Sequence, residues 1–174
     1  MINDSTNESA QVSPLADLFL HGMMGGLIAG LVFVLGKMVL NLALNRPFFG
    51  PLQLTSTLLL GTKALDPSYS LVTASVIGLI VHLCLSALYG MIFVGLLGLT
   101  GQLGAPTKFM LLYGALFGLG LWLVNYYGFA WVMFPQFTLT NPFWNGFVAH
   151  TFSYGIILGA YIAEAWPQPE SGEQ

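Results

Sequence analysis

Residues 70–100 read SLVTASVIGLIVHLCLSALYGMIFVGLLGLT and contain no Asp, Glu, Lys or Arg. An α-helix rises about 1.5 Å per residue, so about 20 apolar residues cross the roughly 30 Å hydrocarbon core of a bilayer. The uncharged run is longer than that minimum, which leaves room for tilt. This stretch therefore predicts a membrane-spanning helix, and it carries His82, Cys84, Ser86 and Tyr89 at bilayer depth.

The composition of the whole chain points to the same environment. Charged residues make up 6% of the chain and hydrophobic residues 56%, against about 25% and about 45–50% in soluble domains. A water-soluble surface cannot be built from so few charges. Nucleic-acid binding needs a cluster of Lys and Arg, and the chain holds only 4 such residues, so we exclude it. The lone Cys84 offers neither a disulfide framework nor a cysteine zinc site.

Three further apolar runs accompany the central one. The predicted spans cover residues 15–44, 71–99, 109–134 and 143–166, with polar tails at residues 1–12 and 167–174. The spans, their connections and the tails account for the whole sequence, and we expect no second domain. The sequence therefore predicts an all-α, polytopic, transmembrane four-helix bundle in a single membrane domain.

The connection between the first two spans, residues 45–70, is unusually long and is broken by several Pro and Gly residues. Its apolar part, residues 51–61, has about 11 residues, which is too few to cross a bilayer. We expect this part to be an interfacial or re-entrant segment. Phe48 and Phe49 beside Arg46 are typical of an interfacial anchor.

Small residues recur at helical spacing in two of the spans. Gly22, Gly26 and Gly30 lie four residues apart and therefore share one face of the first span; Gly114 and Gly118 repeat the device in the third. In lipid, such faces let a neighbouring helix approach closely. We expect them to be packing surfaces.

A short motif occurs in both halves of the chain. Residues 86–90 read SALYG and residues 151–155 read TFSYG, and each follows a connection that contains Pro and Phe. These matches suggest two tandem helical hairpins. Each hairpin would hold two spans, so both would enter from the same side and be related by an axis along the membrane normal.

The few basic residues bear on orientation. Arg46 and Lys63 lie in the first connection and Lys37 lies just inside it, whereas the opposite side has only Lys108. By the positive-inside rule, the first connection faces the cytoplasm and both termini face outwards. The expected location is the bacterial inner membrane.

Polar residues inside spans are the candidates for a ligand site. Counted from one membrane face, Lys37, Asn41, Asn125 and His150 lie at similar depth, beneath the two aromatic connections. If they converge, they would form a binding layer for an anionic or quinone-like headgroup. In the alternative interpretation, Lys37 snorkels to the interface and the others form hydrogen bonds between helices.

The histidines raise a second hypothesis, because facing imidazoles are common axial ligands of haem in membrane proteins. His82 and His150 are the candidate pair, and His21 is counted from the other face. The depth count separates His82 and His150 by roughly 6 Å along parallel helices, which weighs against a shared iron. The alternative is that His82 bonds Ser86 or a neighbouring carbonyl and orders the bundle.

Enzymatic constellations are missing from the pattern. The second and third spans contain no carboxylate, and no nucleophile triad, phosphate-binding loop or metal-binding His pair at helical spacing occurs. A proton-coupled transporter normally keeps an acidic residue in mid-membrane. The sequence therefore favours a non-enzymatic protein, with no cofactor required.

The chain resembles a group of small four-span bacterial membrane proteins of uncharacterised function. The resemblance rests on GLIAGLVF, LLLGTKALDP, HLCLSALYG, LYGALFGLGLWLVNYY and AHTFSYGIILG. It implies a four-span fold and brings no activity or site residue with it.

Three functions remain open at this stage. Glycine-lined faces and 14% aromatic residues suit packing against other transmembrane helices, as in an accessory or structural subunit of a homo- or hetero-oligomeric membrane complex. The first alternative is a small-solute or lipid carrier that uses the layer near Lys37 and His150. The second is a haem-binding electron-transfer subunit.

Overall fold

The computed structural model describes residues 14–140 and 143–166. The polar tails expected at residues 1–12 and 167–174 lie outside the described residues. Within the described part, four helices are long and apolar enough to cross a membrane: Pro14–Ala43, Leu71–Leu99, Thr107–Met133 and Phe143–Ala165. Their ends fall within two residues of the predicted ones, which confirms the four-span, all-helical fold. The chain is an integral, multi-pass membrane protein.

Two of the spans are single helices and two are composite. The first and second are α1 (Pro14–Ala43) and α3 (Leu71–Leu99). The third comprises α4 (Thr107–Leu123), the π-helical η2 (Val124–Ala130) and α5 (Trp131–Met133). The fourth comprises α7 (Phe143–Val148), the π-helical η3 (Ala149–Ile156) and α8 (Ile157–Ala165).

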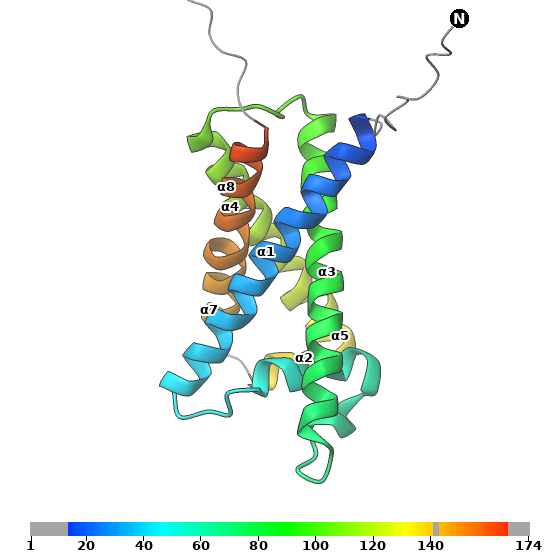
Figure 1. Cartoon of the computed structure of the whole chain (residues 1–174). Coiled ribbons are helices and arrows are strands. Elements are labelled where there is room, and N and C mark those ends of the chain that lie inside the picture. Colours follow the sequence, from blue (N-terminus) through cyan, green and yellow to red (C-terminus); the bar gives the residue numbers. More distant parts are fainter. Residues whose placement is uncertain (1–13, 141–142, 167–174) are drawn as a thin grey trace, which may run out of the picture.

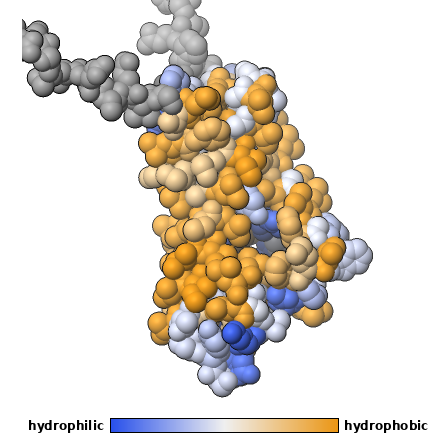
Figure 2. All heavy atoms as spheres, turned by 90° about the vertical axis from the view of Figure 1, so that its right-hand side faces the viewer, coloured by the Kyte–Doolittle hydropathy of each residue, from blue (hydrophilic) through white to orange (hydrophobic). Residues whose placement is uncertain are grey.

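The outward faces of these helices are apolar, as a lipid environment requires. Large hydrophobic side chains such as Val72, Leu116 and Val132 are more than half exposed. In Figure 2 the hydrophobic colour covers most of the height of the molecule, with hydrophilic residues gathered mainly towards its ends and in a hollow part-way down. The solvent for this surface is therefore the bilayer, which makes exposed Leu, Val and Phe favourable rather than costly.

The spans associate as two hairpins. α1 packs along α3, α4 packs along η3 and α8, and α1 also contacts η3 and α8. Figure 1 shows that α1 begins and α8 ends at the same end of the bundle. The edge-to-face contact of His21 with Trp166, at 5.8 Å between ring centroids, lies at that end. This arrangement agrees with the tandem hairpins expected from the sequence.

The repeated motif has the same structural role in both hairpins. A Cβ on Gly90 would meet the Gly22 carbonyl, and a Cβ on Gly155 would meet the Gly114 carbonyl. In each hairpin, the glycine that ends SALYG or TFSYG thus lies against a glycine of the preceding span. The backbones come this close only because no side chain stands between them.

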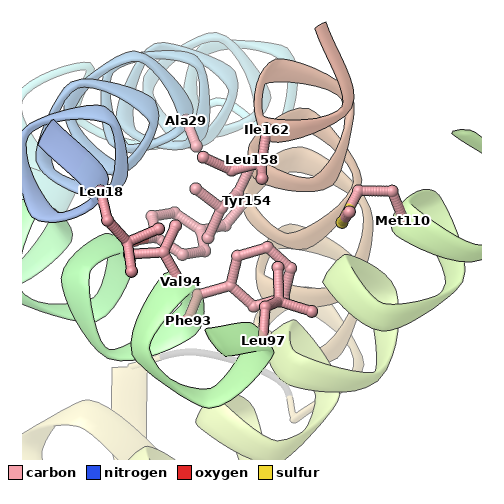
Figure 3. Close-up of a cluster of buried hydrophobic side chains, with 9 residues drawn as sticks. All are labelled: Leu18, Ala29, Phe93, Val94, Leu97, Met110, Tyr154, Leu158 and Ile162. Atoms are coloured by element: carbon pink, nitrogen blue, oxygen red, sulfur yellow. The ribbon is translucent and has the colours of Figure 1, made fainter. Parts of the chain in front are cut away.

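The hydrophobic core occupies the half of the bundle in which α1 begins and α8 ends. α1, α3, α4, η3 and α8 all contribute to it, and Figure 3 shows their side chains converging. Its nine buried members are Leu18, Ala29, Phe93, Val94, Leu97, Met110, Tyr154, Leu158 and Ile162. Dense packing at this end leaves the opposite half of the bundle as the place where a cavity can form.

The short helix α2 (Gly50–Leu60) confirms the segment expected between the first two spans. In Figure 1 it lies across the spans, near the end opposite the start of α1. A Cβ on Gly78 would meet the Leu52 carbonyl, so α2 packs directly on the backbone of α3. Gly78 is seven residues into α3, which places α2 about 10 Å inside the start of that helix. The helix α2 therefore closes one end of the bundle.

A compact turn joins α2 to α3 after the 3₁₀ helix η1 (Thr62–Leu65). Ser68 donates its backbone N–H and its hydroxyl to Asp66 Oδ1, at 2.8 Å and 2.7 Å. These hydrogen bonds lower the pKa of the exposed Asp66 carboxyl, because they favour its charged form. The connection is thus ordered locally, outside the apolar surface.

Candidate functional site

A cavity of about 370 Å³ lies between the two hairpins in the half of the bundle closed by α2. Its apolar or glycine lining residues are Phe33, Val34, Pro51, Leu54, Leu58, Leu85, Leu121, Phe129, Ala130, Phe134, Phe137 and Gly146. Its polar or amphipathic lining residues are Lys37, Thr55, His82, Ser86, Tyr89, Trp122, Asn125, Tyr126, His150 and Tyr154. The volume is within the range of small-molecule sites, roughly 300–1,000 Å³.

The cavity owes its existence to the way the hairpins meet. α3 packs on α1 and α2 but makes few contacts with α4, although only a short link joins α3 to α4 in the chain. The end of the cavity is closed by α2 and by α6 (Gln136–Thr140), where Gln136 Nε2 donates to Thr57 Oγ1 at 3.0 Å. Figure 2 shows a hollow with hydrophilic residues in the side of an otherwise apolar surface. The cavity is therefore open towards the region that lipid occupies.

Lys37 is buried at the cavity wall, with only 9% of its surface exposed. Its Nζ donates to Asn145 Oδ1 at 2.9 Å, which links α1 of the first hairpin to α7 of the second. The interpretation in which Lys37 snorkels to the interface is therefore wrong. The side chain is held inside the bundle because a polar acceptor lies within its reach there.

Residues Asn145 and Gly146 form a meeting point for three lining side chains. Asn145 accepts from Lys37, and the Gly146 carbonyl lies 2.8 Å from His150 Nδ1. A Cβ on Gly146 would lie 3.0 Å from Trp122 Nε1. A glycine at position 146 therefore lets the indole approach the same turn of α7 that holds Lys37.

Trp122 lines the cavity with its ring and carries a buried donor. Its Nε1 has no hydrogen-bond partner among the described residues and almost no accessible surface, so it is not reached from the cavity. The ring is fixed by Tyr126, Tyr127, Phe143 and Phe147, whose centroids lie between 5.6 Å and 6.3 Å away. A buried N–H without a partner is costly, typically about 1–3 kcal/mol. Trp122 therefore contributes an aromatic surface to the cavity wall and no available hydrogen-bond donor.

Two tyrosines cross the hairpin interface in opposite directions. Tyr89 of the first hairpin donates to Asn125 Oδ1 of the second at 3.1 Å. Tyr154 of the second donates to the Ser86 carbonyl of the first at 2.6 Å. Tyr89 and Tyr154 hold the same position in SALYG and TFSYG. The internal repeat therefore extends from the packing of backbones to the hydrogen bonds that frame the cavity.

The structure brings together three of the four residues of the predicted polar layer. Lys37, Asn125 and His150 line the same cavity. Asn41 is not among its lining residues, because its amide Nδ2 turns away and donates to the Pro47 carbonyl at 3.0 Å. Asn41 thus orders the chain after α1. Its inclusion in the layer is corrected, since depth along a helix does not specify the direction of a side chain.

The two residues proposed for haem, His82 and His150, both pack their rings on Phe33, with centroids 5.3 Å and 4.8 Å from it. His82 Nε2 is 2.8 Å from the Gly30 carbonyl, the neighbouring-carbonyl bond that the structural interpretation expects. His150 Nδ1 is 2.8 Å from the Gly146 carbonyl. Axial ligation through His82 Nε2 would require this nitrogen to leave the Gly30 carbonyl.

Other candidate centres are not supported by side-chain clusters. His21 lies near the opposite end, 3.7 Å from Asp17 and far along α1 from the cavity. Within residues 14–140 and 143–166, no group of three or more His, Cys, Asp or Glu could hold a metal ion. The cavity is therefore the feature that carries the functional argument.

Several residues at or beside the cavity were missed by reasoning from sequence. They are the lining residues Trp122 and Tyr154 and the acceptor of Lys37, Asn145. Asn145 is nevertheless a polar residue inside a span, and Tyr154 belongs to the repeated motif. The π-helical segments gave no signal in the pattern. η2 and η3 nevertheless carry Asn125, His150 and Tyr154 to the cavity, as π-helical turns often do at functional sites.

The fold and the site together define a four-span membrane protein with an intramembrane cavity. Comparison of the chain with protein-family models, with curated protein sequences and with solved structures gives no match. The resemblance to small four-span bacterial proteins therefore stays a prediction.

Proposed function

We propose that the protein binds a small amphipathic molecule of the bilayer in the cavity between its hairpins and acts as a non-enzymatic carrier for it. The single observation that carries this proposal is a mostly apolar cavity, open to the lipid region, with a few fixed polar groups at one wall. Such a combination is typical of small-molecule sites, where apolar walls supply affinity and a few polar groups fix orientation.

The accessory-subunit hypothesis is now less well supported. It rested on glycine faces that would pack against other proteins, but Gly22 and Gly26 lie against α3, and Gly114 and Gly118 lie against the fourth span. These faces are used within the chain. Association with further transmembrane helices stays a prediction, and the haem alternative is disfavoured by the contact of His82 Nε2 with the Gly30 carbonyl.

Filling the cavity tests the carrier proposal. Leu85 lines the cavity, whereas Leu88 lies on the same helix with 46% of its surface exposed. We expect wild-type protein and Leu88→Trp, purified in mild detergent, to retain an amphiphile that native mass spectrometry detects. Leu85→Trp should lose most of it, because the indole occupies the ligand volume. Equal retention by the two variants would place the bound molecule elsewhere and refute the proposal.

We also propose that the chain lies in the bacterial inner membrane with both termini outside, supported by Lys37, Arg46 and Lys63 towards one end. In a Cys84→Ala background, we expect Thr62→Cys to react with a membrane-impermeant maleimide only after cell lysis. Thr107→Cys, at the opposite end, should react in intact cells with a permeabilised outer membrane. The reverse pattern of labelling would invert the orientation.

A further inference from the structure

We infer that the molecule held in the cavity is a single-chain amphiphile with an anionic headgroup, a carboxylate or a phosphate, bound at Lys37 and Asn125. This inference rests on the proposed function and specifies its substrate class. The headgroup would lie beside these two side chains, and the chain would follow the apolar wall towards the opening in the lipid region.

Charge selects the sign of the headgroup. Among the described residues that line the cavity, Lys37 is the one Lys or Arg, and there is no Asp or Glu. The three described carboxylates are placed elsewhere: Asp17 and Glu164 lie towards the end of the bundle where α1 begins and α8 ends, and Asp66 lies in the exposed turn after η1. In surroundings of low dielectric, an ammonium attracts an anion and repels a cation much more strongly than it does in water. A cationic headgroup is therefore excluded.

Hydrogen-bond donors select an acceptor group. Asn125 lines the cavity, and its Oδ1 accepts from Tyr89 at 3.1 Å, so its amide N–H groups are what it can offer to a ligand. A carboxylate or phosphate, which accepts through several oxygens, complements an ammonium and an amide donor.

Lys37 lines two hollows. It lines the main cavity, and together with Asn145, which accepts from its Nζ, it lines a second hollow of about 100 Å³ between α1 and the fourth span. The Lys37 side chain thus stands at the inner wall of the main cavity, with the apolar volume on its other side.

The size of the cavity limits the apolar part of the ligand. At about 370 Å³, the cavity is at the small end of the range for ligand sites. It suits one alkyl chain, part of which can leave through the lateral opening, better than the two chains of a phospholipid. Aromatic side chains at the closed end, Phe134 and Phe137, would contact that chain.

A chain-matched pair of probes tests the headgroup separately from the cavity. Palmitate and hexadecanol share a 16-carbon chain and differ in the charge of the headgroup, so their binding to delipidated protein can be compared by native mass spectrometry. We expect palmitate to bind at least about tenfold more tightly than hexadecanol, because a charge-assisted contact is worth more than the about 1.4 kcal/mol that a tenfold change requires. Equal binding would overturn the headgroup inference and leave the carrier proposal standing, whereas binding of neither would overturn both.

Variants assign the selectivity to named side chains. Lys37→Gln should lower the affinity for palmitate at least about tenfold and leave that for hexadecanol unchanged. Asn125→Leu keeps the approximate volume of the side chain and removes the amide donor, and it should lower the affinity for palmitate alone. Lys108→Gln removes the same charge from the exposed start of α4 and should change neither affinity. If Lys37→Gln and Asn125→Leu both fold and both keep the selectivity for palmitate, the headgroup is bound elsewhere and the inference is wrong.

The same measurement distinguishes the two anionic headgroups. Lysophosphatidate carries a phosphate on a single acyl chain, and palmitate carries a carboxylate. Tighter binding of lysophosphatidate would identify a phosphate site and tighter binding of palmitate a carboxylate site. Either result supports an anionic, single-chain ligand, provided that hexadecanol binds more weakly than both.

Discussion

Replacing Gly90 by Ala is expected to destabilise the bundle by about 3 kcal/mol or more, at or above the upper end of the usual range for overpacking. A Cβ at this position would meet the Gly22 carbonyl and would lie 2.8 Å from Gly26 Cα. Both obstacles are backbone atoms of α1, so no side-chain rotation can relieve the clash. The helices α1 and α3 would have to separate along the face on which most of the first hairpin packs.

A matched substitution on the same helix provides the control for Gly90→Ala. A Cβ on Gly95 would make an ordinary contact, 3.7 Å from Phe19 Cε1. Gly95→Ala should therefore leave the free energy of unfolding unchanged or raise it, because alanine favours the helix by up to about 1 kcal/mol over glycine. Equilibrium unfolding in mixed micelles, followed by circular dichroism, measures the difference. Equal stability of the two variants would show that the close approach of the helices is not required.

The internal repeat makes the same test available in the second hairpin. Gly155 occupies the position of Gly90 in the repeated motif, and a Cβ there would meet the Gly114 carbonyl and lie 3.2 Å from Ala115 Cα. A similar loss for Gly155→Ala would establish that both hairpins depend on one packing device. A loss confined to Gly90→Ala would mean that the second hairpin can adjust, for which its π-helical segments offer a means.

The spans and their packing faces could be predicted because both follow from the chemistry of contiguous residues. Long uncharged runs fix where a helix must satisfy its own backbone in lipid. In the structure, both ends of each of the four spans lie within two residues of the predicted ends. Gly22, Gly26 and Gly30 share one face simply because the helix repeats every 3.6 residues. That α3 is the helix packed against this face could be learned only from the three-dimensional structure.

The site was only partly predictable because the depth of a residue in the membrane does not specify the direction in which its side chain points. Counting residues from a membrane face placed Lys37, Asn41 and His150 at one level, but the side chain of Asn41 turns to the Pro47 carbonyl. The same counting assumes a constant rise per residue, which does not hold in the π-helical η3 that carries His150. The acceptor of Lys37, residue Asn145, lies 108 residues away in the chain. No local pattern signals such a pairing.

Removing the acceptor of Lys37 is the second change with a large expected effect. Asn145 is 2% exposed, and Asn145→Leu replaces its amide by an apolar group of similar size. The ammonium would then remain at the buried wall without the 2.9 Å contact to Oδ1. Hydrogen bonds to charged groups are worth about 1.5–3 kcal/mol, and we expect a loss of stability in that range.

The reciprocal change and the double variant show whether this bond joins the hairpins. Lys37→Met leaves Asn145 Oδ1 without its donor and should cost about 1–3 kcal/mol. Combining it with Asn145→Leu removes both polar groups and also the buried Asn145 Nδ2, which has no partner among the described residues. The double variant should therefore be more stable than the sum of the single losses predicts, by a coupling of about 1–3 kcal/mol. Lys108→Met, on the exposed start of α4, should change stability by less than about 0.5 kcal/mol.

Additive losses in this cycle would mean that Lys37 and Asn145 act independently, and α1 and α7 would then be held together by apolar packing alone. A measured coupling would instead show that a polar contact between the hairpins forms part of the cavity wall. This contact is then retained although burying its polar groups costs free energy. In that case Lys37 is kept charged and oriented before any ligand arrives. An anionic headgroup would then meet a cation already in place, without first having to draw a flexible side chain from the membrane interface.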